Sequence, residues 1–288
     1  SSFLKDLSNN FHNDLKLIAE RIFNLTEFHF NLSSPKQLGE VLFDRLKIVD
    51  SPKKTKSGQY STSEEVLSKL AKDHQVVKEV LEWRSLQKLI NTYVDALPKQ
   101  ISPISNRIHA VFNQAVAATG RLSSNNPNLQ NIPIRSKRGR LIRKAFICEN
   151  SNYVMLSADY SQIELRVIAS LSEDPNMISA FKNNEDIHSS TASKVFNINI
   201  SSVTSEQRSN AKTVNFGIIY GVSAFGLSNQ TSLSRLESKE LIESYFNAYP
   251  QLKSYISNQI NFARENGYVE TLLGRKRYLK DINSRNPI

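Results

Sequence analysis

Two carboxylates that follow a short apolar segment are the first candidates for chemistry in this sequence. Residues 153–158 read Tyr-Val-Met-Leu-Ser-Ala, which predicts a β-strand buried on at least one face. Asp159 and Glu164 come directly after it, where a helix is expected to begin, and open sheets place their chemistry at such strand ends. A buried acid there needs a cation, a metal or hydrogen bonds to compensate its lost hydration. The two carboxylates are therefore either metal ligands or members of an ordinary ion pair.

A second group of candidates recurs every four residues along one predicted helix. Thr204 and Gln207 have the spacing of a capping box, which places the start of this helix. Two cations and then two aromatic residues follow as one slowly winding stripe: Arg208, Lys212, Phe216 and Tyr220. That order suits a chain of phosphates attached to a flat nucleoside. The alternative is a solvated basic face that runs into a buried aromatic end.

Two glycines interrupt the same helix. Gly217 and Gly221 each weaken it by up to about 1 kcal/mol relative to alanine, which is expected where a group approaches the backbone closely or the helix ends. A metal-binding carboxylate opposite a triphosphate-binding helix predicts phosphoryl or nucleotidyl transfer. Such reactions need mainly divalent metal and cations around an anionic transition state.

The charge of the chain points to a polyanionic partner. The 288 residues include 37 Lys and Arg against 27 Asp and Glu, a net charge of +10, which favours nucleic acid first and an anionic membrane surface second. The single cysteine, Cys148, excludes an internal disulfide framework and favours a reducing compartment. Residues 214–227 are too short and too polar for a membrane helix. The chain starts at Ser1 without a signal-peptide layout, so we expect a piece of a longer protein.

The first third of the chain is expected to be helical. The apolar spacing predicts helices over residues 1–20 and 76–97, and serine caps predict helix starts after Ser34 and Ser63. Residues 108–118 are strand-like. Helices are expected from Arg166 to the end.

Three polar segments are candidates for contacts with nucleic acid. Residues 51–60 are a basic loop, either solvated or in contact with phosphates. Residues 119–133 form a loop of amides and hydroxyls, which suits sugars and minor-groove acceptors but is also typical of a hydrated loop. The cations of residues 135–144 indicate an anion site rather than only a basic surface. By itself, His188 is more typical of a surface or capping histidine.

Two long motifs carry a family resemblance. Residues 159–166, Asp-Tyr-Ser-Gln-Ile-Glu-Leu-Arg, and residues 208–221 resemble the signature motifs of the bacterial family A DNA polymerases, and the likeness extends from about Phe30 to the last residue. It implies an α+β, right-hand fold with a helical thumb (1–100), part of an antiparallel palm sheet (101–166) and helical fingers (167–288). The implied activity is template-directed DNA synthesis in replication and repair, with primer-template DNA and a dNTP as partners. A monomeric, cytoplasmic, nucleoid-associated protein with no membrane partner is expected.

The resemblance also implies roles for individual residues. Asp159 and the carbonyl of Tyr160 would hold two Mg²⁺ ions. The nucleotide would be bound by Gln162, Glu164, His188, Arg135, Arg208, Lys212, Phe216 and Tyr220. Among these, Lys212 would also act as a general acid, and Glu164, hydrogen-bonded to Tyr220, would exclude a ribose 2′-hydroxyl. Primer-template DNA would be contacted by Arg121, Gln130, Asn131, Lys53, Lys54 and Lys56.

One departure from the family pattern concerns the metal site. The sequence contains no His-Asp-Glu triplet, which in the family supplies the second metal-binding aspartate. The fragment is therefore expected to be inactive or nearly so by itself, because one carboxylate holds two metals poorly. A non-catalytic module that binds primer-template DNA and nucleotide is the alternative. A single-subunit RNA polymerase is a third possibility, against which Glu164 and Phe216 argue.

Overall fold

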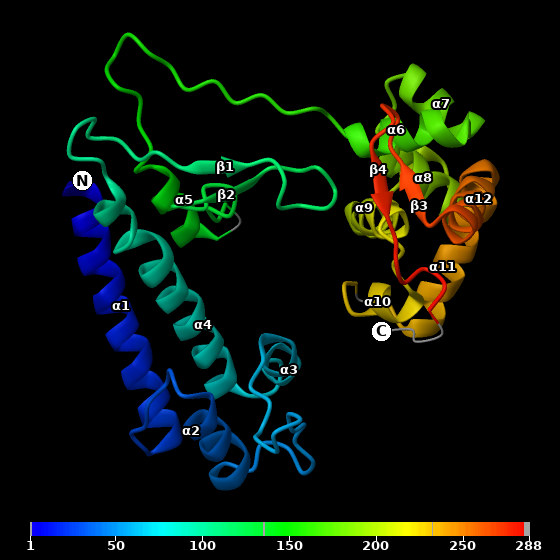
Figure 1. Ribbon diagram of the computed structural model, residues 1–288. Coiled ribbons are helices and arrows are strands. Elements are labelled where there is room, and N and C mark those ends of the chain that lie inside the picture. Colours follow the sequence, from blue (N-terminus) through cyan, green and yellow to red (C-terminus); the bar gives the residue numbers. More distant parts are fainter. Residues whose placement is uncertain (1, 135, 232, 285–288) are drawn as a thin grey trace. The chain divides into compact units, whose positions relative to one another are not determined.

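The computed structural model describes residues 2–134, 136–231 and 233–284 (Figure 1). The chain divides into two compact units, Ser1–Met155 and Leu156–Ile288. Among the described residues, no helix is long and apolar enough to cross a membrane.

The first unit is built on two long helices. α1 packs against α4, and the remaining elements are short. The bounds of its elements are α1 (Ser2–Thr26), α2 (Pro35–Gly39), the π-helical turn η1 (Glu40–Arg45), α3 (Glu64–Leu70), α4 (Gln75–Leu89), the π-helical turn η2 (Ile90–Val94), the 3-10 turn η3 (Leu97–Gln100), β1 (Val111–Asn113), β2 (Ser123–Asn125) and α5 (Lys137–Arg143). β1 and β2 form an antiparallel pair in which Phe112 lies opposite Ser124. This unit is thus a helical pair with one small sheet.

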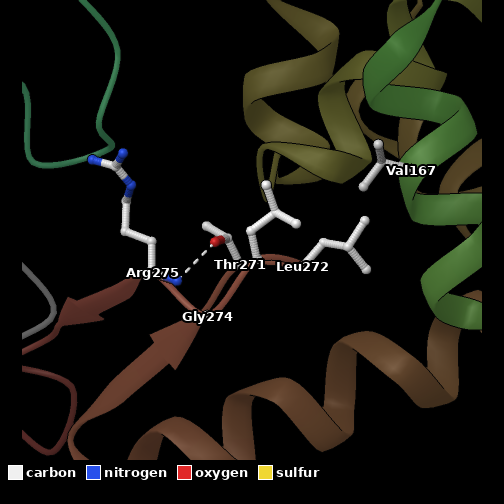
Figure 2. Close-up of a pocket in the computed structure, with 6 residues that line it drawn as sticks. Val167, Thr271, Leu272, Gly274 and Arg275 are labelled. Carbon is white, nitrogen blue, oxygen red and sulfur yellow. Dashed lines mark hydrogen bonds between the residues drawn. The ribbon is translucent and has the colours of Figure 1, made fainter.

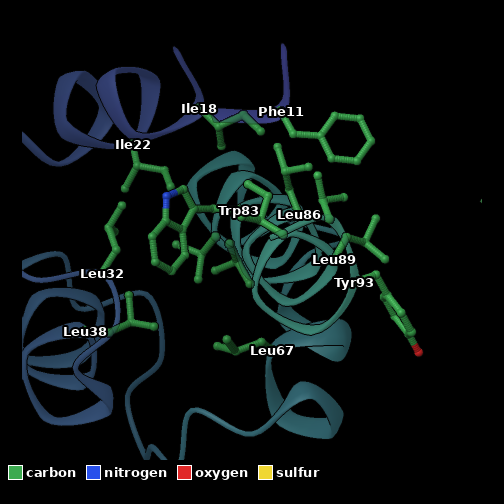
Figure 3. Close-up of a cluster of buried hydrophobic side chains, with 14 of the residues drawn as sticks. Phe11, Ile18, Ile22, Leu32, Leu38, Leu67, Trp83, Leu86, Leu89 and Tyr93 are labelled. Carbon is green, nitrogen blue, oxygen red and sulfur yellow. The ribbon is translucent and has the colours of Figure 1, made fainter. Parts of the chain in front are cut away.

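The core of the first unit is apolar and continuous between α1 and α4. Phe11, Ile18 and Ile22 come from α1, and Trp83 and Leu86 come from α4. In Figure 3 the side chains of Ile18 and Ile22 lie beside Trp83. Burial of each such side chain stabilises the fold by about 1.5–3 kcal/mol. The helical spacing predicted for the first third of the chain is therefore explained by this one contact.

The second unit is helical except for one hairpin. Its elements are α6 (Ile163–Ser172), α7 (Pro175–Lys182), α8 (Ile187–Phe196), the 3-10 turn η4 (Ile200–Ser202), α9 (Ser205–Ile219), α10 (Ala224–Ser228), α11 (Arg235–Ala248), α12 (Pro250–Asn266), β3 (Tyr268–Glu270) and β4 (Lys276–Tyr278). β3 and β4 are antiparallel, with Val269 opposite Arg277. The core lies among α6, α8, α9 and α11 and includes Leu165, Val214 and Tyr245. The two units together make an α+β fold with antiparallel sheets, as predicted.

Most predicted helix starts are confirmed. Ser34 caps α2 by accepting a hydrogen bond from the Gln37 N–H at 3.3 Å, and Ser63 caps α3 in the same way through Val66. The helix expected over 76–97 begins at Gln75 and ends in the turns η2 and η3. Helix prediction succeeded here because caps and apolar spacing act within a few residues.

The strand predicted over residues 153–158 is wrong. These residues are extended and exposed, and Val154 and Leu156 are 89% and 88% accessible. A β-strand exists only when a second strand satisfies its backbone groups, and neither sheet of the described residues includes this segment. The strand-like stretch 108–118 is likewise reduced to the three residues of β1. In both places the side-chain pattern favoured a strand, but a strand forms only where a second strand pairs with it.

Candidate functional site

Helix α9 presents the predicted stripe on its open side. The capping box is confirmed: the Gln207 N–H donates to Thr204 Oγ1 at 3.2 Å, and the Thr204 N–H donates to Gln207 Oε1 at 3.0 Å. Arg208 and Lys212 are exposed, Phe216 is half-buried, and Tyr220 follows the last helical residue and is exposed. The opposite face is buried through Ala211, Val214, Asn215 and Ile218. The core thus fixes the helix and leaves the cations and one ring accessible.

The first cation of the stripe is already paired. The Arg208 Nη2 atom lies 2.7 Å from the Asp186 Oδ2 atom, and the other carboxylate oxygen accepts the Ser189 N–H at 2.7 Å, which caps α8. Burial raises the pKa of Asp186, but the hydrogen bonds from Arg208 and Ser189 outweigh it and lower the pKa to about 2. Asp186 is therefore ionised at neutral pH and anchors Arg208 to the first turn of α8.

His188 is buried rather than on the surface. Its side chain is 3% accessible, its ring centroid lies 5.8 Å from that of Phe216, and its Nδ1 atom lies 3.1 Å from Asn215 Nδ2. Burial lowers the pKa of His188, Asp186 opposes this change, and the positive charges of Arg208 and Lys212 add to it. The ring is therefore neutral at pH 7.

Sequence reasoning missed the polar network around His188. Asn215 on α9 and Thr191 on α8 are both fully buried, and Thr191 Oγ1 also lies 2.9 Å from the Tyr249 hydroxyl. The signal was an amide within an apolar stretch of a helix, between Val214 and Phe216. The network joins α8, α9 and the end of α11 through buried hydrogen bonds.

The hydrogen bond predicted between Glu164 and Tyr220 is confirmed. The Tyr220 hydroxyl donates to Glu164 Oε2 at 2.7 Å and so ties the first turn of α6 to the end of α9. A cavity of about 340 Å³ is lined by both residues together with Ile163, Val167, Ile168, Leu171, Ile219 and Tyr255. A polar pair at the rim of an apolar cavity can orient a ligand that has a ring and a hydroxyl group.

A larger cavity, shown in Figure 2, shares Val167 with this one. It has a volume of about 540 Å³ and is lined by Val167 on α6 and by the β3–β4 loop from Thr271 to Arg275. The Arg275 N–H donates to Thr271 Oγ1 at 3.1 Å, which closes that loop. Its lining includes none of the residues predicted for the nucleotide, so it is not the candidate site.

The glycines of α9 have the two purposes expected. A Cβ atom on Gly217 would lie 2.7 Å from Val222 Cγ1, because the chain folds back after the helix and the Val222 N–H donates to the Gly217 carbonyl at 2.8 Å. Gly221 has φ +72°, a conformation that ends the helix and that other residues rarely adopt. Gly217 therefore permits a close approach, and Gly221 permits the turn.

The predicted metal residues are exposed. Asp159 and Tyr160 lie in the extended stretch before α6, and Gln162 precedes that helix in a left-handed conformation with φ 54°. Within the described ranges, no three His, Cys, Asp or Glu side chains are close enough to hold a metal ion. A two-ion site needs several oxygen ligands around each ion, so the described residues do not fit a complete one.

The basic loop of the first unit is a small hairpin. The Thr55 N–H donates to the Gln59 carbonyl at 2.7 Å, the Ser61 N–H donates to the Lys53 carbonyl at 2.8 Å, and Lys54 Nζ lies 5.1 Å from the Tyr60 ring. Lys53, Lys54 and Lys56 are all exposed on it. The structure thus brings the three lysines together on an ordered loop.

The amide loop of the first unit is held by its own hydrogen bonds. Gln130 Oε1 accepts the Ser124 N–H at 3.2 Å, and Gln130 Nε2 donates to the Leu122 carbonyl at 3.2 Å. The Tyr93 hydroxyl donates to the carbonyl of Asn131, and both Asn131 and Arg121 have exposed side chains. Gln130 therefore stabilises the loop. The side chains of Arg121 and Asn131, which were predicted to contact DNA together with Gln130, are exposed.

The cations before the extended segment differ in their contacts: one is paired with acids, and others are exposed. Arg138 is bound by two acids, Glu82 at 2.8 Å and Asp14 at 3.0 Å, whereas Lys137 and Lys144 are exposed. Arg135 lies outside the described residues. One cation of the predicted anion site, Arg138, is thus paired with two carboxylates of the protein itself.

Comparisons with known proteins agree on one family. The model of DNA polymerase family A matches residues 1–288. DNA polymerase I of Caldicellulosiruptor bescii is 50% identical over 274 residues, which cover 95% of this chain and 32% of the relative. DNA polymerase I of Geobacillus stearothermophilus is 49% identical over 272 residues, which cover 94% of this chain and 31% of the relative. The chain therefore spans about a third of these relatives.

A solved structure is similar over nearly the whole chain. It is the POL domain of Pol1 from M. smegmatis in complex with DNA primer-template and dNTP, with a TM-score of 0.89 and 41% identity over 99% of this chain and 50% of that chain. Sequence motifs, fold and family model all agree. The chain belongs to DNA polymerase family A.

Proposed function

We propose that this chain is the thumb-to-fingers part of a template-directed DNA polymerase, which binds primer-template DNA and a dNTP. The observation that carries the proposal is the open face of α9, where Arg208 and Lys212 precede Phe216 and Tyr220, with Glu164 hydrogen-bonded to Tyr220 at 2.7 Å. Family membership and the DNA and dNTP bound by the M. smegmatis relative support it. Residues 1–100, 101–166 and 167–288 are proposed as thumb, partial palm and fingers.

The proposed roles follow the order of groups along α9. Arg208 and Lys212 bind the triphosphate, and Lys212 can give a proton to the leaving pyrophosphate because an ammonium group carries one to give. Phe216 lies against the sugar. Glu164, held by Tyr220, occupies the space that a ribose 2′-hydroxyl would need. Gln162, His188 and Arg135 complete the proposed nucleotide site.

The proposed DNA contacts lie in the first unit. Lys53, Lys54 and Lys56 neutralise duplex phosphates, which gives sequence-independent, salt-dependent affinity. Arg121, Gln130 and Asn131 contact the minor groove near the primer end, where arginine and amides are favoured. A monomeric, cytoplasmic, nucleoid-associated protein is the accompanying prediction.

One side chain of this chain, that of Asp159, is proposed as a ligand of a divalent cation. Asp159, with the carbonyl of Tyr160, is proposed as the divalent-cation ligand of this chain, and bound Mg²⁺ supplies Lewis-acid chemistry in polymerases. Among the described residues, no group of three metal-binding side chains includes Asp159.

That same observation favours a second candidate function. A chain with one exposed carboxylate at the metal position would bind DNA and dNTP without joining them. Primer extension by the 288-residue chain in Mg²⁺ separates the two: extension supports polymerase activity in this chain, and binding without extension supports the binding module.

The nucleotide site is tested by titration of the chain with dATP. Lys212→Gln is expected to weaken binding about tenfold or more, because a charge-assisted hydrogen bond to phosphate is lost. Lys239→Gln is the matched control: this lysine is also exposed, lies on another helix of the same unit and pairs with Glu243 at 3.7 Å. Equal affinities of the two variants, or no dATP binding by the wild-type chain, would contradict the proposal.

A further inference from the structure

The buried amide of Asn215 faces two acceptors. Its Nδ2 atom lies 3.1 Å from His188 Nδ1 and 3.1 Å from Thr191 Oγ1. An amide nitrogen carries two hydrogens, so each acceptor can receive one. The Asn215 Oδ1 atom is satisfied by the Thr191 hydroxyl at 3.2 Å.

The opposite orientation of the amide would reverse the hydrogen bond with His188. With its oxygen facing His188 and Thr191, the oxygen would require the Thr191 hydrogen and a proton on His188 Nδ1. In that orientation the ring proton would lie on Nδ1 and Nε2 would carry no hydrogen. Asn215 is fully buried, and the structure places its NH₂ group, not its oxygen, against His188 Nδ1.

This hydrogen bond decides which nitrogen of His188 carries the proton. If Nδ1 accepts from Asn215, the neutral ring must carry its hydrogen on Nε2. Charged groups of both packed helices surround the ring: Asp186 at the start of α8, and Arg208 and Lys212 on α9. Because the ring is buried and two cations lie near it, His188 is expected to be neutral and to donate through one nitrogen only.

We propose that Asn215 is a positioning residue that fixes His188 as the neutral tautomer with its hydrogen on Nε2, ready to donate to a phosphate oxygen of the nucleotide. The tautomer depends only on the contacts between α8 and α9. The donation to phosphate rests on the function proposed above. Asn215 itself does not touch the nucleotide.

Imidazole ¹⁵N nuclear magnetic resonance of the 288-residue chain tests the tautomer directly. The chain has five histidines, and the other four serve as internal references: His12, His29, His74 and His109. His188 is expected to show an unprotonated Nδ1 and a protonated Nε2 at neutral pH. A protonated Nδ1 in the wild-type chain would overturn the proposal without any variant.

Asn215→Asp replaces the amide donor that faces His188 Nδ1 by a carboxylate acceptor. A buried carboxylate facing Nδ1 is expected to draw the proton to that nitrogen and to raise the pKa of His188. Asn210→Asp is the matched control, because it adds the same charge on α9 at a half-buried position. An unchanged His188 spectrum in folded Asn215→Asp, or the same change in Asn210→Asp, would count against the proposal.

The nucleotide half is tested by adding dATP. The His188 Nε2 resonance is expected to shift in the wild type. At a pH where the same spectra show the ring of Asn215→Asp to be neutral, this variant is expected to bind dATP about tenfold more weakly than Asn210→Asp, because Nε2 then has no hydrogen to donate. If wild type binds dATP but Nε2 does not respond, the donation to phosphate is refuted. If wild type shows the Nε2 tautomer and binds no dATP, the proposed function fails and the tautomer assignment stands.

Discussion

The carboxylate of Asp186 joins two helices through two different oxygens. One oxygen caps α8, and the other lies 2.7 Å from the guanidinium of Arg208 on α9. The first cation of the proposed triphosphate site is therefore held by a helix cap. Its position depends on α8 as much as on α9.

The stability of the chain is expected to fall at acid pH through Asp186. Its pKa is about 2 in the folded protein against an ordinary value of 3.8, so the stabilisation is complete above the ordinary pKa and is lost as pH falls through the folded one. Because the side chain is 40% exposed, the contribution is about 1 kcal/mol after solvent screening. Urea denaturation followed by circular dichroism from about pH 2 to pH 7 measures it.

Asp186→Asn separates the charge from the cap. Asparagine still caps a helix, so the variant loses only the ion pair, and its stability should not decline between about pH 4 and pH 2 through this residue. A decline as steep as in the wild type would show that other carboxylates are responsible.

Tyr220→Phe is expected to weaken discrimination against ribonucleotides. The variant removes the hydroxyl that holds Glu164 at 2.7 Å, so the carboxylate is less firmly placed, while stability changes by less than about 0.5 kcal/mol at this exposed position. Titrations with dATP and ATP give the affinity ratio. Tyr278→Phe, at a similarly exposed tyrosine on β4, should leave the ratio unchanged.

Gly217→Ala is expected to destabilise the second unit by about 1–2 kcal/mol, although alanine is the better helix former. The new methyl group would lie 2.7 Å from Val222 Cγ1. Val222→Ala should relieve most of the clash, because it removes Cγ1 and leaves only its Cβ at 3.3 Å. The double variant should therefore be more stable than the sum of the single effects predicts. Urea denaturation of all four proteins measures the coupling, and strict additivity would exclude the contact.

Arg138→Ala is expected to destabilise the first unit by about 1–2 kcal/mol, because Glu82 and Asp14 lose their shared partner. Lys137→Ala, at the exposed neighbour, should leave stability unchanged and weaken DNA binding instead. The chain has a single tryptophan, Trp83, next to Glu82, so its fluorescence reports this unit. Equal stability of the two variants would contradict a structural role of Arg138.

Local features of the site were predictable from the sequence. The capping box of Thr204 and Gln207, the spacing of the stripe and the purpose of Gly217 and Gly221 all depend on neighbours within a few residues. The Glu164 to Tyr220 hydrogen bond followed from family resemblance instead, because the two residues are 56 positions apart.

Partners between distant elements were not predictable. Nothing in the residues around His188 indicates that α9 covers it, and so its burial and the amide of Asn215 were missed. The same reason explains Arg138, whose acids lie 56 and 124 positions away, and residues 153–158, whose pattern was right for a strand. A side-chain pattern indicates which secondary structure a segment prefers, whereas the packing of distant elements determines which residues come into contact.

The exposure of residues 154–158 has a thermodynamic consequence for Asp159, which directly follows them. The carboxylate is only as well ordered as the segment that carries it, and this segment is paired with neither sheet of the described chain. A strand that docked on it would reduce the entropic cost of cation binding at Asp159. By reciprocity, a cation held there would tighten the docking of that strand by the same factor.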